Sequence, residues 1–160
     1  MATETKLTVI LHADIVGSTE LVRRDERLAH ERIQSAFRRF SEAISSQGGT
    51  THEIRGDALV VEFERASDAV NAALAFQSEN RQHNATLDDP VQPEVRVGIA
   101  LGEVVIADKT VTGVGVVLAQ RLEQLAAPGG VCISAAVREA LPDRLAVDYV
   151  DLGEQTLKGF

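Results

Sequence analysis

One segment near the N-terminus constrains the fold of this chain most, because it predicts a strand that runs directly into a helix. Residues 7–11 form an apolar run that is typical of a buried strand. The acid Asp14 follows at the junction, and Gly17 then allows a ligand to approach the backbone closely. Ser18 or Thr19 is suited to cap a helix whose free N–H groups face an anion. We therefore expect metal and phosphate binding at this junction.

A Gly-Asp pair between two β-rich runs predicts the second half of the site. The runs are residues 50–54 and 59–63, and the pair is Gly56-Asp57. Because Gly-Asp between such runs is a hairpin-turn signal, we expect Asp57 at the tip of a hairpin. Asp57 and Asp14 could then face each other from neighbouring strands. The alternative is that each is an ordinary turn or cap aspartate, which is the commoner role of Asp beside Gly.

The bulk composition limits the classes of function. The chain has 160 residues, 44% of them hydrophobic, which suits one domain with its own core. Its net charge of −8, with 16 basic against 24 acidic residues, argues against a nucleic-acid surface. No apolar run approaches the roughly 18 residues of a membrane span. The single cysteine, Cys132, excludes an intrachain disulfide, so we expect a buried thiol and a cytoplasmic location.

Hydrophobic periodicity alternates between helical and strand patterns along the rest of the chain. Gly102-Glu103 interrupts one strand pattern, and Pro128 ends the helix before it. The four histidines lack the spacing of zinc ligands, so we interpret them as surface or core residues. The predicted helices cover residues 19–47, 67–83, 114–126 and 135–141, and the predicted later strands cover 94–101, 104–106, 130–134 and 145–152.

These segments together resemble the class III adenylate and guanylate cyclase domain. ADIVGSTEL and GGTTHEIRGDALVVEF are similar to its two metal-binding segments, and RVGIALGEVV, TGVGVVLAQRLEQLAAPGGVCIS and DLGEQTLKG match later segments in order. The resemblance implies an α/β (α+β) fold with a ferredoxin-like βαββαβ core, in which helices cover a mixed, mainly antiparallel sheet. It also implies a single cyclase domain over residues 1–160, excised from a longer protein, because a final strand follows the LKG-like piece in the family.

The resemblance also implies a set of metal ligands and phosphate contacts. Asp14 and Asp57, with the carbonyl of Ile15, would hold two Mg²⁺ or Mn²⁺ ions. Arg121 stands where the family has its transition-state arginine, and Lys158 matches a lysine that contacts the triphosphate. Without the resemblance, Arg121 would be interpreted as part of a helix-surface ion pair with Glu123 or its neighbours, and Lys158 as a solvated side chain.

Three positions depart from the pattern of an active adenylate cyclase or give mixed signals. Glu53 stands where adenylate cyclases read the adenine with lysine and guanylate cyclases carry glutamate, although Arg55 could neutralise it in a structural salt bridge. Thr110 occupies the partner position, where adenylate cyclases carry Asp or Thr. Val117 replaces the asparagine that orients the ribose. One lost transition-state hydrogen bond of about 3 to 4 kcal/mol corresponds to roughly 10²- to 10³-fold in rate.

The sequence therefore predicts a nucleotide cyclase that acts on ATP in preference to GTP. The family builds its site across a homodimer, so Asp14 and Asp57 of one subunit would face Glu53, Thr110, Val117 and Arg121 of the other. The main alternative is a degenerate cyclase homology domain that binds nucleotide or only dimerises. Guanylate cyclase activity ranks below these two. An enzyme of the diguanylate-cyclase kind ranks last, because that family's acidic Gly-Gly turn motif is absent.

Overall fold

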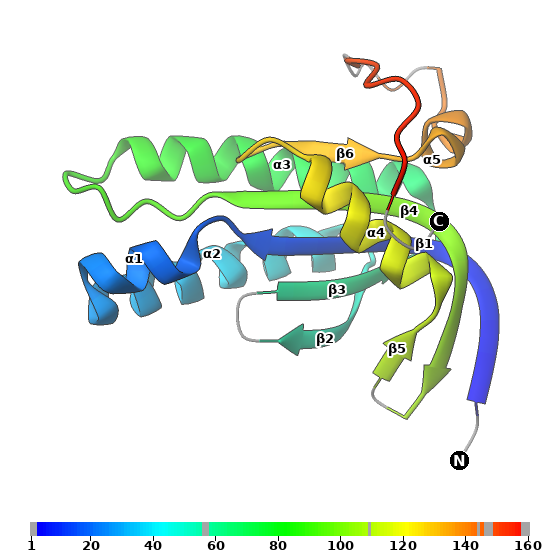
Figure 1. Ribbon diagram of the computed structural model, residues 1–160, viewed down its shortest axis with the longest axis horizontal. Coiled ribbons are helices and arrows are strands. Elements are labelled where there is room, and N and C mark those ends of the chain that lie inside the picture. Colours follow the sequence, from blue (N-terminus) through cyan, green and yellow to red (C-terminus); the bar gives the residue numbers. More distant parts are fainter. Residues whose placement is uncertain (1–2, 56–57, 109, 144, 146–148, 158–160) are drawn as a thin grey trace.

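The computed structural model describes residues 3–55, 58–108, 110–143, 145 and 149–157, with only the backbone at residues 53–55. A mixed sheet lies between helices on both of its faces (Figure 1). The strands are β1 (Thr3–Ile15), β2 (Thr50–Arg55), β3 (Ala58–Phe63), β4 (Val95–Ala107), β5 (Thr110–Thr112) and β6 (Val131–Ile133). The helices are α1 (Ser18–Arg24), α2 (Glu26–Ser46), α3 (Ala66–Ala85), α4 (Val114–Leu125) and α5 (Ala135–Ala140).

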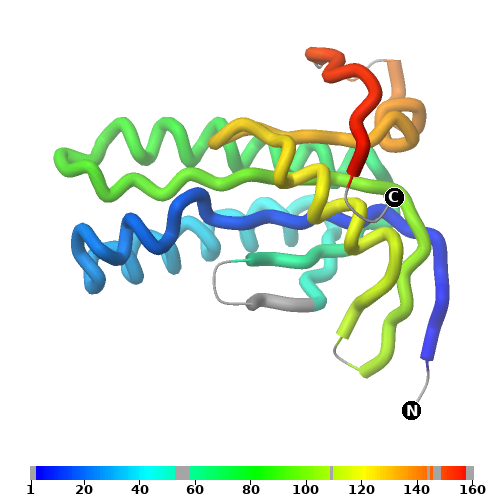
Figure 2. The backbone as a smooth tube through the Cα atoms, in the orientation of Figure 1, coloured from blue at the N-terminus to red at the C-terminus, as the bar shows by residue number. Residues whose placement is uncertain are grey.

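Strand β1 is the centre of the sheet. The strand order is β2-β3-β1-β4-β5, and β6 pairs with β4 in parallel while the other pairs are antiparallel. Strands β1 and β4 run side by side along their whole length (Figures 1 and 2). This arrangement confirms the α+β fold with a ferredoxin-like core and a mainly antiparallel sheet.

Helices α2 and α3 cover one face of the sheet with a large apolar core. Alternate residues of β1, among them Val9, Leu11 and Ala13, point into this core because side chains of a strand alternate between its two faces. The rings of Phe40 and Phe76 stack at its centre, with centroids 4.1 Å apart. Both phenylalanines are essentially inaccessible to solvent, so the contact between α2 and α3 is dry.

Helix α4 crosses the other face and approaches the sheet unusually closely (Figure 1). A Cβ atom at Gly98 of β4 would lie only 2.2 Å from the backbone oxygen of Ala119. A Cβ atom at Gly102 would lie 2.8 Å from the Cα atom of Gly115. We call Gly98, Gly102 and Gly115 the glycine seam, because only residues without a Cβ atom allow the helix to lie at this distance.

The predicted helix over residues 19–47 is wrong in one respect, because it is two helices. Asp25 separates α1 from α2 with an extended backbone, and its side chain accepts a hydrogen bond of 3.0 Å from the Leu28 amide. An aspartate in this role starts a new helix, since its carboxylate satisfies an amide that would otherwise lack a partner. The helix predicted over residues 67–83 is confirmed as α3, which begins at Ala66 after Arg65 at the cap position.

Two strand predictions also need correction. The break predicted at Gly102-Glu103 is absent, because β4 continues to Ala107 with β1 as an uninterrupted partner. The strand predicted over residues 145–152 is not formed at residues 149–152, where the chain has no regular structure. None of the described helices combines the length and the apolarity that crossing a bilayer requires.

Candidate active site at the end of the central strand

Asp14 lies where the central strand ends, on the sheet face that α4 covers. It is half-buried and stands between Ala58 of β3 and Arg96 of β4, which are its paired neighbours. Ile15 follows with its side chain buried on the opposite face. The carboxylate of Asp14 and the main-chain oxygen of Ile15 are oxygen donors, which fit a hard divalent cation.

Asp57, the second predicted metal ligand, lies outside the described residues. The hairpin that was predicted to carry it is confirmed on both sides, because Arg55 of β2 pairs with Ala58 of β3. Ala58 in turn stands directly opposite Asp14. The described residues contain no group of three His, Cys, Asp or Glu side chains that could hold a metal ion, and the shared site of the two aspartates stays a prediction.

Gly17, not Ser18 or Thr19, occupies the cap position of α1. Gly17 has a φ of 60°, in the left-handed region that favours glycine, and its carbonyl accepts a 3.1 Å hydrogen bond from the Leu21 amide. Ser18 and Thr19 therefore lie inside the first turn of α1, and the prediction that one of them caps the helix is wrong. Their role toward phosphate stays a prediction.

Val117 and Arg121 lie one helical turn apart on the side of α4 that faces away from the sheet. Val117 is 37% exposed, and Arg121 is half-buried and donates a 3.3 Å hydrogen bond to the side chain of Gln124. Glu123, the partner that the alternative interpretation gave to Arg121, is only 2% exposed and lies against the sheet. Residues two apart on a helix do not face each other, so the two side chains leave α4 in different directions.

The remaining predicted residues are not gathered around Asp14. Thr110 is exposed in β5, where its hydroxyl donates a 2.9 Å hydrogen bond to the carbonyl of Ala107. Asp14 pairs with Arg96, eleven residues before Ala107 along β4, which corresponds to about 35 Å of extended strand. The Glu53 backbone lies in β2, but its side chain is not described, and Lys158 lies outside the described residues.

Two buried carboxylates on the α4 face were not predicted from the sequence. The first is Glu123, whose oxygens lie 3.5 Å from Nδ1 of His12 and 3.6 Å from Nε of Arg96. Here His12 is a core histidine with an acidic partner. The sequence signal that could have placed His12 on this face is the alternation of side chains along β1, because His12 stands two residues before Asp14 and therefore points to the same side.

The second buried carboxylate is Glu62 of β3. It accepts hydrogen bonds of 2.9 Å from the Thr8 hydroxyl and 2.7 Å from the Lys6 ammonium, and its other oxygen lies 2.9 Å from Nε2 of His52. Burial alone would raise the pKa of Glu62, but the hydrogen bonds from Lys6, His52 and Thr8 outweigh it, and the pKa lies below its ordinary value. The carboxylate is therefore held in its charged form.

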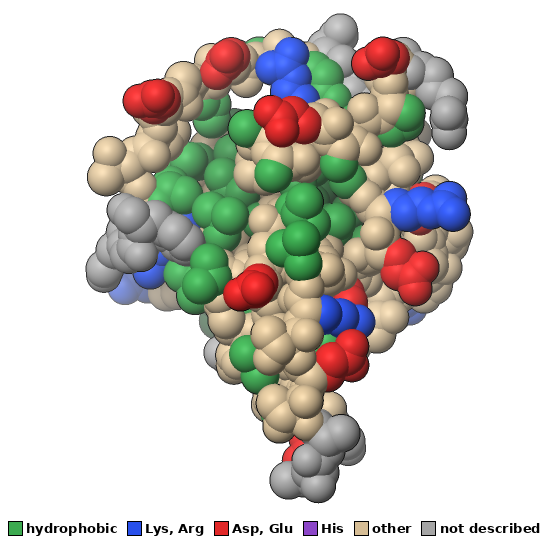
Figure 3. All heavy atoms as spheres, turned by 90° about the vertical axis from the view of Figure 1, so that its right-hand side faces the viewer, with side chains coloured by type: hydrophobic (Ala, Val, Ile, Leu, Met, Phe, Trp, Pro, Cys, Tyr) green, Lys and Arg blue, Asp and Glu red, His purple; other side chains and the backbone are tan. Residues whose placement is uncertain are grey.

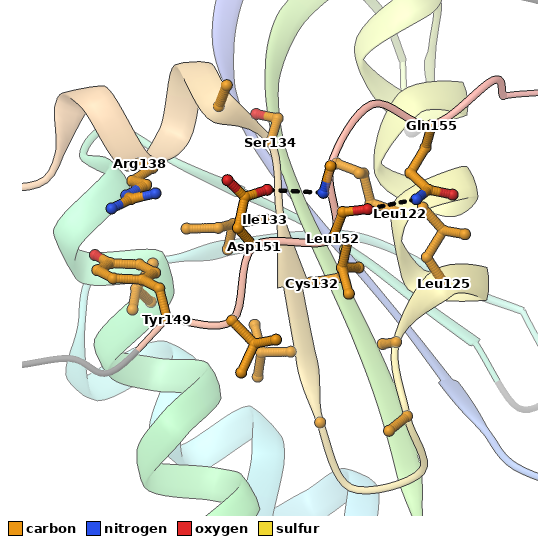
Figure 4. Close-up of a pocket in the computed structure, with 18 of the residues that line it drawn as sticks. Leu122, Leu125, Cys132, Ile133, Ser134, Arg138, Tyr149, Asp151, Leu152 and Gln155 are labelled. Carbon is orange, nitrogen blue, oxygen red and sulfur yellow. Dashed lines mark hydrogen bonds between the residues drawn. The ribbon is translucent and has the colours of Figure 1, made fainter.

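An apolar cavity of about 710 Å³ lies apart from these residues, between α4, β6, α5 and the segment 149–157. Figure 3 shows apolar side chains gathered over the centre of the face at the right of Figure 1, with a hollow near its upper edge. In Figure 4 the guanidinium of Arg138 lies over the ring of Tyr149, 4.6 Å from its centroid. Cys132 lines this cavity and is half-buried rather than fully buried as predicted, and this burial raises the pKa of its thiol.

The sheet, with α2 and α3 on one face and α4 on the other, and with Asp14 near the end of the central strand, defines an α+β domain with a candidate cation site. The family model described as "Adenylate and Guanylate cyclase catalytic domain" matches residues 1–160. The chain therefore belongs to the adenylate and guanylate cyclase catalytic domain family.

Sequence relatives include proteins named as adenylate cyclases. The chain is 35% identical over 154 residues to "Putative adenylate cyclase 3" of Rhizobium meliloti, which covers 96% of this chain and 26% of that protein. It is 34% identical over 130 residues to "Adenylate cyclase" of Streptomyces coelicolor, covering 81% of this chain and 32% of that protein. The chain thus spans about a quarter to a third of the length of these two relatives.

Solved structures of the family share the fold over nearly the whole chain. The adenylate/guanylate cyclase/hydrolase from Silicibacter pomeroyi is 32% identical with a TM-score of 0.89, and the match covers 99% of this chain and 93% of that chain. The adenylyl cyclase CyaB from P. aeruginosa is 26% identical with a TM-score of 0.83, and the match covers 100% of this chain and 91% of that chain.

Proposed function

We propose that this domain is a metal-dependent cyclase that converts ATP to 3′,5′-cyclic AMP and pyrophosphate in a signalling pathway. The observation that carries the proposal is the position of Asp14, which ends the central strand directly opposite Ala58, the residue after Asp57. Two carboxylates brought to this edge of the sheet would suit a nucleoside triphosphate, because bridging cations offset the repulsion between acid and phosphate.

In this proposal Asp14, Asp57 and the carbonyl of Ile15 hold two Mg²⁺ or Mn²⁺ ions. When bound, these ions would supply charge neutralisation for the phosphates and help ionise the ribose 3′-hydroxyl. Residues 17–19 border the phosphates from the start of α1. Arg121 donates hydrogen bonds to the α-phosphate as its charge develops, and Lys158 contacts the triphosphate. The protein thus contributes mainly positioning and charge stabilisation.

A head-to-tail homodimer would complete the site in this proposal. The span of about 35 Å of strand between the partners of Asp14 and of Thr110 supports this, because one chain does not place the two residues together. Exposed apolar side chains, including Leu7 at 65%, Val114 at 59% and Val117, offer contact area for a second copy.

Val117 favours a second candidate function, a degenerate cyclase domain that binds nucleotide or only dimerises. Its isopropyl group is exposed on α4 and can neither donate nor accept a hydrogen bond to a ribose. The relatives named as adenylate cyclases support ATP as the substrate, whereas Glu53 is the residue that guanylate cyclases carry. We place guanylate cyclase activity third.

The test is an assay of the purified chain with Mn²⁺ and either ATP or GTP, with cyclic product and oligomeric state measured together. We expect cyclic AMP from a dimer, and absence of product from both nucleotides in a folded dimer would contradict the enzyme.

Val117→Asn supplies the missing amide and should raise kcat by up to roughly 10²-fold. Val117→Leu, which matches the shape of Asn without a hydrogen-bond donor or acceptor, is the matched control. If Val117→Asn and Glu53→Lys both bind nucleotide without turnover, the degenerate domain is favoured.

A further inference from the structure

We propose that Glu123 is a positioning residue, which fixes the rotation of α4 on the sheet and thereby the direction in which Arg121 faces. The inference rests on the cyclase function proposed above, because it concerns the arginine that would stabilise the transition state. Glu123 is the charged residue that α4 buries, while Arg121 leaves the same helix toward its accessible side.

The Glu123 side chain lies between two residues of neighbouring strands. Its backbone is next to Gly98, where an added Cβ atom would be 2.3 Å from the Glu123 nitrogen. From there one oxygen lies 3.5 Å from His12, which is paired with Gly98, and the other lies 3.6 Å from Arg96. The carboxylate therefore connects α4 to the last part of β1 and the first part of β4, where Asp14 lies.

The rest of the inner face of α4 is apolar, with Val116 and Leu118 packed beside its buried residues. Its other buried residues are Gly115, Ala119 and Leu122. Gly115 lies against Gly102, and Ala119 lies against Gly98. Both contacts are made through backbone atoms, so the helix and the strand approach closely there. Apolar packing tolerates a range of helix rotations, whereas a polar side chain between two partners favours one orientation.

The geometry of the bridge gives it little value for stability alone. Both contacts exceed the 3.2 Å that bounds most direct hydrogen bonds of this type. Nδ1 of His12, Nε of Arg96 and one oxygen of Glu123 have no hydrogen-bond partner among the described residues. Buried ion pairs of this kind are often no more stabilising than apolar side chains of similar volume, and their best attested use is to select one arrangement.

The orientation of Arg121 follows from helix geometry. At 100° per residue, side chains two positions apart point about 160° away from each other. Anchoring Glu123 against the sheet therefore turns Arg121 outward, toward the side where a second copy would contribute the metal-binding residues in the proposed dimer. A rotation of α4 by one residue would redirect the guanidinium and leave the overall fold unchanged.

The kinetic test compares Glu123→Gln with Glu62→Gln, which also removes the charge of a buried carboxylate on the same sheet face but not in α4. We expect Glu123→Gln to lower kcat at least tenfold with KM for Mn²⁺-ATP changed less than threefold, because a misdirected Arg121 affects the transition state. Glu62→Gln should leave kcat per folded molecule within twofold. Equal kcat losses in both variants, or none in Glu123→Gln, would overturn the proposal.

Hydrogen exchange tests the same proposal without activity. In Glu123→Gln the amides of α4 should exchange at least tenfold faster than in the wild type, while those of β1 and β3 stay unchanged; in Glu62→Gln α4 should keep its protection. If Glu123→Gln does not fold, the same measurement is made on His12→Leu, which removes one partner of Glu123. Unchanged exchange in α4 would overturn the proposal. A wild type without cyclic product contradicts the proposed function instead, and the exchange result still decides whether Glu123 holds α4.

Discussion

The two faces of the sheet are built on different principles. The face under α2 and α3 is large and apolar, with Phe40 and Phe76 stacked at its centre. The face under α4 has a smaller apolar cluster, the glycine seam and two buried carboxylates, Glu62 and Glu123. One face gains stability from buried apolar area, whereas the other buries charged groups along β1 at a cost in desolvation.

This difference indicates how the domain can separate stability from function. Substitutions under α2 and α3 should change the free energy of unfolding and leave the chemistry of the folded molecule alone. Substitutions where α4 contacts the end of β1 and the start of β4 should change activity more than their effect on unfolding suggests. The predictions below test this contrast, beginning with the largest effect.

Phe40→Ala should have the largest effect on stability. Removing a fully buried ring leaves a cavity between α2 and α3, and such changes cost about 3 to 5 kcal/mol in the free energy of unfolding. Denaturant unfolding measures this loss, and kcat per folded molecule should stay within twofold. A large loss of kcat in the remaining folded protein would show that the two faces are not independent.

Gly98→Ala should lower both the free energy of unfolding and kcat. Its methyl group would lie 2.2 Å from the Ala119 oxygen, so α4 must move away from the sheet. Overpacking of this kind costs about 1 to 3 kcal/mol. Because the backbone of Glu123 is displaced at the same time, kcat should fall further than stability does. Gly48→Ala, at a glycine with no atom near the added methyl group but a positive φ, is the control for loss of stability without movement of α4.

Glu62→Gln should give the smallest effect, a change in how the free energy of unfolding depends on pH in the acidic range. The pKa of Glu62 is lowered in the folded state, so its stabilising contribution is complete above its ordinary pKa and is lost as the pH falls through the lowered one. The difference in the free energy of unfolding between wild type and Glu62→Gln should therefore shrink on acidification. A difference that stays constant with pH would show that the charge of Glu62 contributes nothing.

Local sequence patterns predicted the fold well, because most of its helices and strands follow the periodicity of hydrophobic residues and are bounded by turn-forming residues. The hairpin around Gly56-Asp57 and the helix before Pro128 are confirmed on this basis. The division at Asp25 was missed because an apolar spacing continues through it, and β4 was divided because Gly102 suggested a turn although it faces Gly115 of α4. Propensity does not report what packs against a residue.

The site was predictable only in part for a related reason. Asp14 was identified from the junction of strand and helix, which is a local signal. The contacts of Glu123 with His12 and Arg96 join three distant segments, and they depend on strand register and on how closely α4 approaches. Such contacts produce no characteristic spacing of residues that could be recognised in the sequence.

The most direct test of the whole account is the rate of cyclic nucleotide formation by the wild type and by Asp14→Asn, with Mn²⁺ and ATP. Asn keeps the shape of the side chain but lacks the charge that would hold the cation. We predict product from the wild type and a rate per folded molecule lower by roughly 10³-fold in Asp14→Asn. Equal rates from the two proteins would contradict a catalytic centre at the end of β1.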